Sequence, residues 1–256
     1  MVNTITLGFH NTAAAASIGK TATKDENGPQ GLTAALTGGA SAMCYTSEDV
    51  MAATFNVDLI NEVGRCIGED CLAMGYSGLY GPGINMHRTA YCGRNFEYYS
   101  EDPFVAGTIC AAEVQGIQSK GVYVYLKHVA LNDSETSRRG VNTWLNEQTA
   151  REIYLEVADK AITDGGAWSV MTGFNRWGAT WCGANANLLT GFLRGELGMR
   201  GMCITDFSGS SQYMDLVDGL IAGSDIWDSP MPKIHTTKAA NYENDAYIVT
   251  QMRDRK

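Results

Sequence analysis

Short apolar runs alternate with longer amphipathic stretches along the 256 residues of the chain. Apolar or small-residue runs with the length of a buried strand occur at Ala42–Thr46, Ser77–Tyr80, Val122–Lys127, Trp168–Thr172, Met202–Asp206 and Leu220–Ile226. Strands that alternate with helices are typical of a parallel sheet with crossover helices. We therefore predict an α/β protein.

Helix start and stop signals lie between these runs. Ser47 and two acidic residues precede apolar side chains at helical spacing. Those side chains are Met51, Phe55, Leu59, Val63 and Ile67. Asp102-Pro103 provides a cap followed by proline at the first helical position, and Gly121 ends that helix. Two further helices are predicted from Asn146 to Gly165 and over Leu188–Leu197.

A TIM-type (β/α) barrel fits this order better than a dinucleotide-binding fold, because no GxGxxG follows the first strand. Six or seven strands are readable, whereas a closed barrel has eight, so we expect the barrel to be irregular or incomplete. We assign residues 1–232 to the barrel domain. The chain becomes polar from about Lys233, and we interpret residues 233–256 as a C-terminal linker or a truncated helix.

The composition of the chain excludes several classes of function. Apolar residues make up 45 % of the chain, enough for a sizeable core, and the net charge of -9 argues against binding to nucleic acid. The seven cysteines form no CxxC pair, so we expect buried free thiols in a reducing compartment. No signal peptide and no apolar stretch of about 18 residues is visible, which predicts a cytoplasmic protein without a membrane span. The histidines lack metal-ligand spacing, and we predict neither metal nor cofactor.

Charged residues gather at the ends of predicted strands, where the loops of a barrel converge on one site. Arg94 lies in the segment that follows the run Ser77–Tyr80, Lys127 ends the run Val122–Lys127 with His128 directly after it, and Asp206 ends the run GMCITD. Cationic donors can hold vicinal hydroxyls while a carboxylate attacks an electrophilic carbon, so the set predicts a polyol pocket. Three other readings remain: Asp206 as a turn cap, Arg94 in an ordinary ion pair with Glu97, and Lys127 as a Schiff-base residue.

Several longer motifs carry a family resemblance. GPGINMHR, GRNFEYYSEDP, YLKHVALNDSE, SVMTGFNRWG, LLTGFLRGELGMRGMCITDF and LIAGSD stand in the order in which they recur in glycoside hydrolase family 3. The chain resembles this family from about Lys24 to Asp228. The resemblance implies the N-terminal-type barrel of a retaining exo-β-glycosidase, similar to β-glucosidases and β-xylosidases, that acts on small β-glycosides or oligosaccharides.

The resemblance also implies roles for single residues. Asp206 matches the nucleophile that forms a covalent glycosyl-aspartate intermediate. The expected substrate-binding residues are Asn27, Arg94, Lys127, His128 and Met171. Arg94 and Lys127 are also expected to keep the pKa of Asp206 low.

Four positions depart from the family pattern. Asn27 replaces a carboxylate that accepts hydrogen bonds from the far hydroxyls of the sugar, and Thr33 stands where arginine is common. Phe174 replaces a tyrosine beside the nucleophile, and Phe207 replaces a tryptophan. These differences leave the preferred sugar open.

The general acid/base is the largest gap. In similar β-glucosidases a following α/β sandwich domain supplies it, and the loop LNDSETSRRG lacks the histidine of the Asp-His alternative. Glu97, Glu101, Asp133 and Glu135 are candidates, although in the family pattern they resemble structural hydrogen-bonding residues. Two hypotheses follow. The chain is either the nucleophile-bearing barrel of a β-glycosidase, or a catalytically incomplete sugar-binding fragment that needs a missing sandwich domain or a homo-oligomeric partner.

Overall fold

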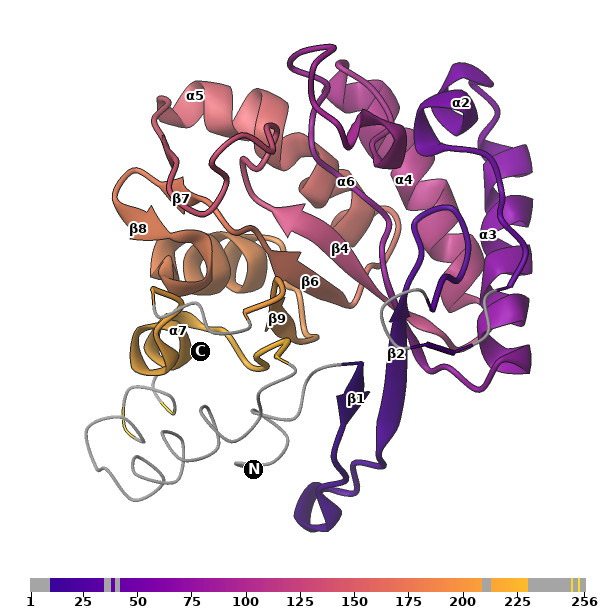
Figure 1. Cartoon of the computed structure of the whole chain (residues 1–256), viewed down its shortest axis with the longest axis horizontal. Helices are drawn as coiled ribbons and strands as arrows, with labels where there is room; N and C mark the ends of the chain where they lie inside the picture. The colour runs from indigo at the N-terminus through magenta and orange to yellow at the C-terminus, as the bar shows by residue number, and fades with distance from the viewer. Residues whose placement is uncertain are drawn as a thin grey trace.

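The computed structural model describes residues 10–34, 38–39, 42–208, 213–229, 250 and 253. Its main sheet has six strands in the order β1-β2-β3-β4-β6-β9. Their bounds are β1 Asn11–Thr12, β2 Thr23–Asn27, β3 Gly78–Tyr80, β4 Tyr123–Val129, β6 Ser169–Thr172 and β9 Cys203–Thr205. β1 is antiparallel to β2, and the other neighbouring strands are parallel. Helices cover the outer side of this sheet (Figure 1).

This sheet is the predicted barrel in an incomplete form. Ile226 adds one parallel bridge beside Ile204 of β9, so within the described residues the main sheet has six strands and the start of a seventh. A second, small sheet joins β5 (Asn142–Thr143), β7 (Arg176–Trp177) and β8 (Thr180–Trp181). The predicted fold class, an α/β barrel with six or seven strands, is confirmed. The domain boundary at residue 232 and the segment after it fall almost wholly outside the described residues.

Four of the predicted strands are present as β3, β4, β6 and β9, and two predictions were wrong. Ala42–Thr46 is a loop, in which the N–H groups of Ala42 and Tyr45 donate to the carbonyls of Leu32 and Gln30. The first three residues of Leu220–Ile226 belong to helix α7 (Leu216–Ala222), and within the rest only Ile226 forms a strand bridge, to Ile204. Asp215 caps this helix by accepting hydrogen bonds from two backbone N–H groups. A short apolar run does not distinguish a strand from a buried helical turn.

Strand β2 was not predicted because its sequence, TKDEN, contains no apolar residue. Asp25 and Glu26 are nevertheless fully buried. Asp25 accepts hydrogen bonds from the hydroxyl groups of Tyr123 and Tyr125 on β4. Side-chain hydrogen bonds thus compensate for burying polar groups, which a hydrophobic pattern cannot reveal.

The helices follow their sequence signals with one correction. They are α2 Glu48–Ala53, α3 Val57–Ala73, α4 Pro103–Gln118, α5 Glu147–Thr149, the π-helical η3 Ala150–Leu155, α6 Glu156–Thr163, the π-helical η5 Asn187–Glu196, and the short 3₁₀ turns η1 Ala16–Ile18, η2 Asn95–Glu97 and η4 Cys182–Ala184. Asp102 and Asn146 cap α4 and α5 as predicted. The helix predicted after Ser47 is broken in two, because Phe55 has a positive φ of 50° and Asn56 caps α3.

Two apolar layers enclose the sheet. The outer layer packs helices against strands. Within it, α3 and α4 approach closely at Gly64 and Gly116, because a Cβ at either position would lie 2.4 Å or 2.2 Å from a carbonyl oxygen of the facing helix. The inner layer contains Tyr80, Tyr125, Met171, Ile204 and Ile226. Because side chains alternate along a strand, one face of the sheet packs on the helices and the other fills the barrel interior.

The predicted free thiols are present: the seven cysteines form no disulfide, and five are buried. Among the helices in the described part of the chain, none is long and apolar enough for a membrane span.

A pair of buried carboxyl groups lies between α2 and α4. Glu48 and Glu113 are both fully buried, and the hydroxyl group of Tyr99 donates to Glu113 Oε2 at 2.6 Å. Burial raises the pKa of Glu113 to about 7, and the hydrogen bond from Tyr99 opposes this only in part. Burial, followed by the nearby Glu113, raises the pKa of Glu48 well above its ordinary value. At least one of these groups therefore resists ionisation in the folded protein.

This pair predicts a pH-dependent stability. The folded-state pKa of Glu113 exceeds its unfolded value, so its contribution is complete below about pH 4.5 and is lost as the pH rises through about 7. We expect the free energy of unfolding, measured by urea titration, to fall by about 2–3 kcal/mol over this range. In Glu113→Gln, which keeps an acceptor for Tyr99, the decrease should be clearly smaller. The exposed Glu62→Gln on α3 should behave as the native protein, and identical pH profiles for all three proteins would contradict this account.

Candidate active site

A cavity of about 440 Å³ opens where the parallel strands end. It is lined by His10, Asn27, Tyr80, Arg94, Lys127, His128, Glu135, Arg138, Arg139, Met171, Phe174, Asp206, Phe207 and Asp228. The cavity therefore brings together all six site residues predicted from the sequence. Asn27 ends β2 near one edge of the sheet, and Asp228 follows Ile226 at the other edge. The sheet is thus curled enough for residues from both ends to line one cavity.

Asp206 directly follows β9 and is 8 % exposed. Its backbone N–H donates to the carbonyl of Thr172 at 3.1 Å, which continues the pairing between β9 and β6. Its Oδ1 accepts a hydrogen bond of 2.7 Å from the N–H of Phe207. Oδ2 is buried without a hydrogen-bond partner among the described residues. One oxygen is therefore fixed, and the other is available to a ligand.

The pKa of Asp206 is shifted in the direction opposite to the one expected from the sequence. Burial raises the pKa of Asp206, and the charges of Arg94, Arg138 and Lys127 together with the Phe207 N–H oppose this without cancelling it. The prediction that cationic neighbours hold this pKa low is therefore wrong in its net direction. The neighbours were correctly identified, but the cost of burying the carboxylate was underestimated.

Lys127 and His128 are neighbours in the sequence and both line the cavity. Successive side chains of a regular strand point to opposite faces, but the register between β4 and β6 shifts between Lys127 and Val129. Such an irregularity re-aims a side chain at the end of a strand. Met171 of β6 pairs with Lys127 on one side and with Ile204 on the other, so it forms the cavity floor between the cations and Asp206.

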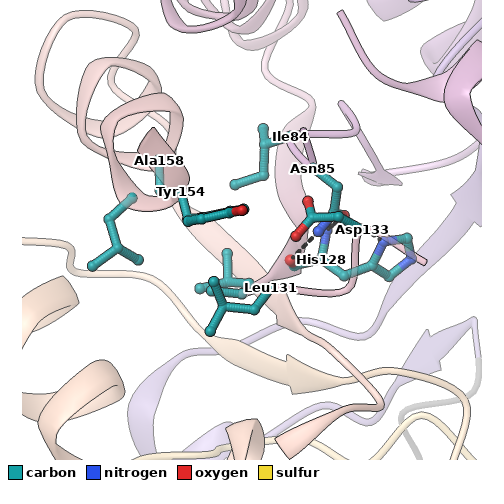
Figure 2. Close-up of a pocket in the computed structure, with 10 residues that line it drawn as sticks. Ile84, Asn85, His128, Leu131, Asp133, Tyr154 and Ala158 are labelled. Atoms are coloured by element: carbon teal, nitrogen blue, oxygen red, sulfur yellow. Dashed lines mark hydrogen bonds between the residues drawn. The ribbon is translucent and has the colours of Figure 1, made fainter. Parts of the chain in front are cut away.

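Asn85 fixes the proton position on His128. Its Oδ1 accepts from the His128 backbone N–H at 2.8 Å and lies 3.1 Å from Nδ1, while its Nδ2 donates to the His128 carbonyl (Figure 2). Because Oδ1 is an acceptor, Nδ1 carries the proton. Nε2 is then free to accept from Arg94 Nη2 at 3.1 Å. Burial, together with the charges of Arg94, Lys127 and Arg138, lowers the pKa of His128 well below its usual range, so the ring is neutral.

A buried ion-pair network lies beside His128. Glu97 accepts from Arg94 Nε at 2.6 Å and from Arg94 Nη2 at 3.0 Å, and its Oε2 lies 3.2 Å from Lys127 Nζ. Burial alone would raise the pKa of Glu97, but Lys127 and Arg94 outweigh it and lower the pKa to about 2. The suspected ion pair of Arg94 is therefore present, and it lies at the cavity wall, where it holds two cationic side chains in place.

The four acid/base candidates occupy different places. Glu97 stays ionised in the network above. Asp133 is buried outside the cavity, where it accepts from the Met86 N–H, and burial raises its pKa to about 6. Glu101 is exposed and does not line the cavity, whereas Glu135 does but pairs with Arg138 at 2.7 Å. Of the four, Glu135 alone lines the cavity, and its carboxylate is engaged by Arg138 and lies 3.8 Å from Arg94.

Several cavity residues were not predicted. Arg138 and Arg139 belong to the loop after β4, and the Arg138 guanidinium lies 4.3 Å from the ring centre of Phe174. Asp228 is the other important addition, and a sequence signal for it exists. Ile204-Thr-Asp206 and Ile226-Trp-Asp228 repeat the same spacing of an apolar residue and an acid at neighbouring strands. No group of three or more potential metal ligands occurs among the described residues.

The network around Glu97 predicts a second stability effect. Because the folded-state pKa of Glu97 is depressed, its contribution is present above about pH 4.5 and is lost as the pH falls towards 2. Glu97→Gln removes the counter-charge of the buried Lys127 and the hydrogen-bonded carboxylate of Arg94, which keeps a longer contact of 3.8 Å with Glu135, so we expect about 3–5 kcal/mol less stability near pH 7. The difference should shrink as the pH falls. Urea unfolding beside the exposed control Glu101→Gln measures it, and a pH-independent difference would be inconsistent with an ionic origin.

Comparisons with known proteins identify relatives of this chain. Residues 23–227 match the family described as "Glycosyl hydrolase family 3 N terminal domain". Thermostable beta-glucosidase B of Acetivibrio thermocellus is 35 % identical over 237 residues, which are 90 % of this chain and 31 % of that protein. Beta-glucosidase B of Emericella nidulans is 36 % identical over 204 residues, which are 79 % of this chain and 24 % of that protein.

The fold also matches solved structures. The structure of beta-glucosidase 3B from Thermotoga neapolitana in complex with glucose has a TM-score of 0.81 and 30 % sequence identity, and the match covers 95 % of this chain and 36 % of that one. The chain thus spans about a third or less of the length of these relatives. The resemblance inferred from the sequence motifs is confirmed. The chain belongs to glycosyl hydrolase family 3 and carries the N-terminal domain of that family.

Proposed function

We propose that this domain carries the nucleophile and the sugar-binding site of a retaining β-glycosidase, with β-glucosides as the substrate class. The observation that carries the proposal is the position of Asp206. Its Oδ2 accepts no hydrogen bond from the described residues and lies 3.6 Å from His128 Nε2, in a cavity that Arg94 and Lys127 also line. A carboxylate beside donors that suit vicinal hydroxyls is the arrangement that glycosyl transfer to an aspartate requires.

In the first step, Asp206 Oδ2 attacks the anomeric carbon, and the bond from that carbon to the leaving oxygen breaks. The product is a glycosyl ester of Asp206, which water later hydrolyses with retention of configuration. Arg94 and Lys127 donate to sugar hydroxyls, and these hydrogen bonds strengthen as positive charge develops on the ring. Because Glu97 fixes both cations beforehand, little reorganisation is needed when the substrate binds.

The leaving oxygen also needs a proton, from a carboxyl group about 5–5.5 Å from the nucleophile. Glu97, Glu101, Asp133 and Glu135 are each poorly suited, for the reasons given above. We propose that the acid comes from protein outside this chain, either a further domain or another subunit. The short span of the chain relative to its relatives supports this idea. Without that part, the chain would be a sugar-binding domain able to form the covalent ester only with an activated leaving group.

The names of the relatives support the choice of substrate. Two curated relatives are called beta-glucosidases, and the Thermotoga neapolitana enzyme was solved with glucose. Asn27 lines the same cavity but supplies an amide where relatives are expected to have a carboxylate. The sugar preference of this domain therefore depends on other side chains at that end of the cavity.

Labelling with a 2-deoxy-2-fluoro-β-glucoside of dinitrophenol tests the nucleophile, because this leaving group departs without protonation. We expect one glycosyl group per chain, located at Asp206 by peptide mass spectrometry, and no label in Asp206→Asn. Asp218→Asn, which removes an exposed carboxylate from the first turn of α7, should label as the native chain does.

Hydrolysis of cellobiose distinguishes a chain that lacks its general acid from a chain that is a complete enzyme. Labelling without hydrolysis of cellobiose would mean that the acid lies outside the chain, and labelling with hydrolysis would mean that the chain is a complete enzyme. Absence of label, or label on a residue other than Asp206, would contradict the proposed function.

A further inference from the structure

Asp228 is a second carboxyl group in the cavity, and the proposed reaction does not use it. It is 4 % exposed and lines the same cavity as Asp206. Its Oδ1 is buried and has no hydrogen-bond partner among the described residues. A buried polar atom in a native fold normally has a partner, so an unpartnered one that lines a cavity indicates a ligand group.

The sheet register places Asp228 beside Asp206. Ile204 and Ile226 form a parallel bridge and share the inner apolar cluster. Asp206 and Asp228 each follow the bridged isoleucine by two residues, and residues two apart on a strand point to the same face. Neighbouring strands lie about 4.8 Å apart. The two side chains are thus adjacent at the mouth of the barrel, yet Asp206 Oδ2 and Asp228 Oδ1 make no hydrogen bond with each other.

The backbone around Asp228 is firmly held. Its N–H donates to Thr205 Oγ1 at 3.0 Å, and its carbonyl accepts from both the N–H of Ser208 at 2.7 Å and the hydroxyl of Ser208 at 3.0 Å. These bonds tie the residue to the end of β9. Asp228 is therefore positioned by the same strand end that positions Asp206.

The electrostatic surroundings of the two acids differ. Arg94, Arg138 and Lys127 act on Asp206, whereas the charges acting on Asp228 are those of Asp206, Asp25 and Glu26. Burial, followed by these like charges, raises the pKa of Asp228 well above its ordinary value. Asp228 is accordingly the more readily protonated member of the pair, and a protonated carboxyl group can both donate and accept a hydrogen bond.

The strand order then relates Asp228 to the sugar. Lys127 and His128 are on β4, Asp206 follows β9, and Asp228 lies beyond β9 in the sheet. In a pyranose, C2 with the vicinal hydroxyls lies on one side of the anomeric carbon, and the ring oxygen with C5 and its hydroxymethyl group lies on the other. If the anomeric carbon faces Asp206 and the vicinal hydroxyls face the cations, the hydroxymethyl edge faces Asp228.

We propose that Asp228 determines sugar specificity by hydrogen-bonding the hydroxymethyl group of the terminal sugar. The inference rests on the proposed function, because the position of the sugar is set by attack at Asp206. It assigns to Asp228 the selection of hexosides over pentosides, which have the same ring without that group. Asn27, at the other edge of the sheet, lines the same cavity and replaces the carboxylate that the family is expected to use as an acceptor for the far hydroxyls of the sugar. Asp228 would supply a carboxyl group to the sugar in its place.

Two matched substrates test this role. We would measure second-order rate constants for labelling by 2-deoxy-2-fluoro dinitrophenyl β-glucoside and by the corresponding β-xyloside, in the full chain. Asp228→Leu should lower the glucoside constant by about 10- to 100-fold and the xyloside constant by less than about 3-fold. Asp228→Asn keeps a donor and an acceptor, so both constants should stay within about 3-fold of native. Asp218→Asn is the control, and Asp228→Ala replaces the leucine variant should that protein not fold.

Each other outcome overturns the assignment. Equal loss on both sugars, or no loss on either, would mean that Asp228 does not contact the hydroxymethyl group. Unchanged labelling combined with lost hydrolysis of poor leaving groups in Asp228→Asn would make Asp228 the proton donor instead. A native chain that takes label from neither sugar would remove the proposed function and this inference together, whereas native labelling with an unaffected leucine variant would remove this inference alone.

Discussion

The cost of burying the Asp206 carboxylate is the constraint on which the site depends. Burial raises its pKa, and the charges of Arg94, Arg138 and Lys127 offset that cost in part. Those cations would repel one another and a nearby charged histidine, but Glu97 pairs with two of them and His128 stays neutral. These side chains thus form a network in which the carboxylate of Glu97 compensates the charges of Arg94 and Lys127. Such a network can present donors to a neutral sugar without first moving them.

The curvature of the sheet turns this network into a pocket. Parallel strands place their carboxyl ends at one edge, and curling brings Asn27 and Asp228 from opposite ends of the sheet to one cavity. Small irregularities complete the arrangement. The register shift in β4 lets Lys127 and His128 line the same cavity. Asn85, which does not line that cavity, sets the tautomer of His128 through its contact with Nδ1 (Figure 2). The cavity therefore contains both cationic and acidic side chains, and the proposed function assigns them to different edges of a pyranose.

Much of this was visible in the sequence. Apolar runs gave β3, β4, β6 and β9, and the residues at their ends include the predicted nucleophile and cations, which the structure brings into one cavity. What was missed has a physical reason. Strand β2 buries two acids, of which Asp25 accepts hydrogen bonds from two tyrosines that lie far away in the sequence. The run before Ile226 is equally compatible with the helix that Asp215 caps. The net pKa of Asp206 depends on a balance of burial and charge that appears only once the fold is known. Asp228 lies beside Asp206 because Ile204 and Ile226 pair, and the repeated spacing of isoleucine and aspartate becomes informative only once that pairing is known.

A crystal structure of the chain trapped with a 2-deoxy-2-fluoroglucosyl group tests the central claim most directly. The account predicts a covalent bond between Asp206 Oδ2 and the anomeric carbon, with Arg94 and Lys127 within hydrogen-bonding distance of the sugar hydroxyls. The Glu97 ion pairs should be the same with and without the sugar. A sugar bound away from these residues, or an Asp206 whose Oδ2 turns out of the cavity, would contradict it.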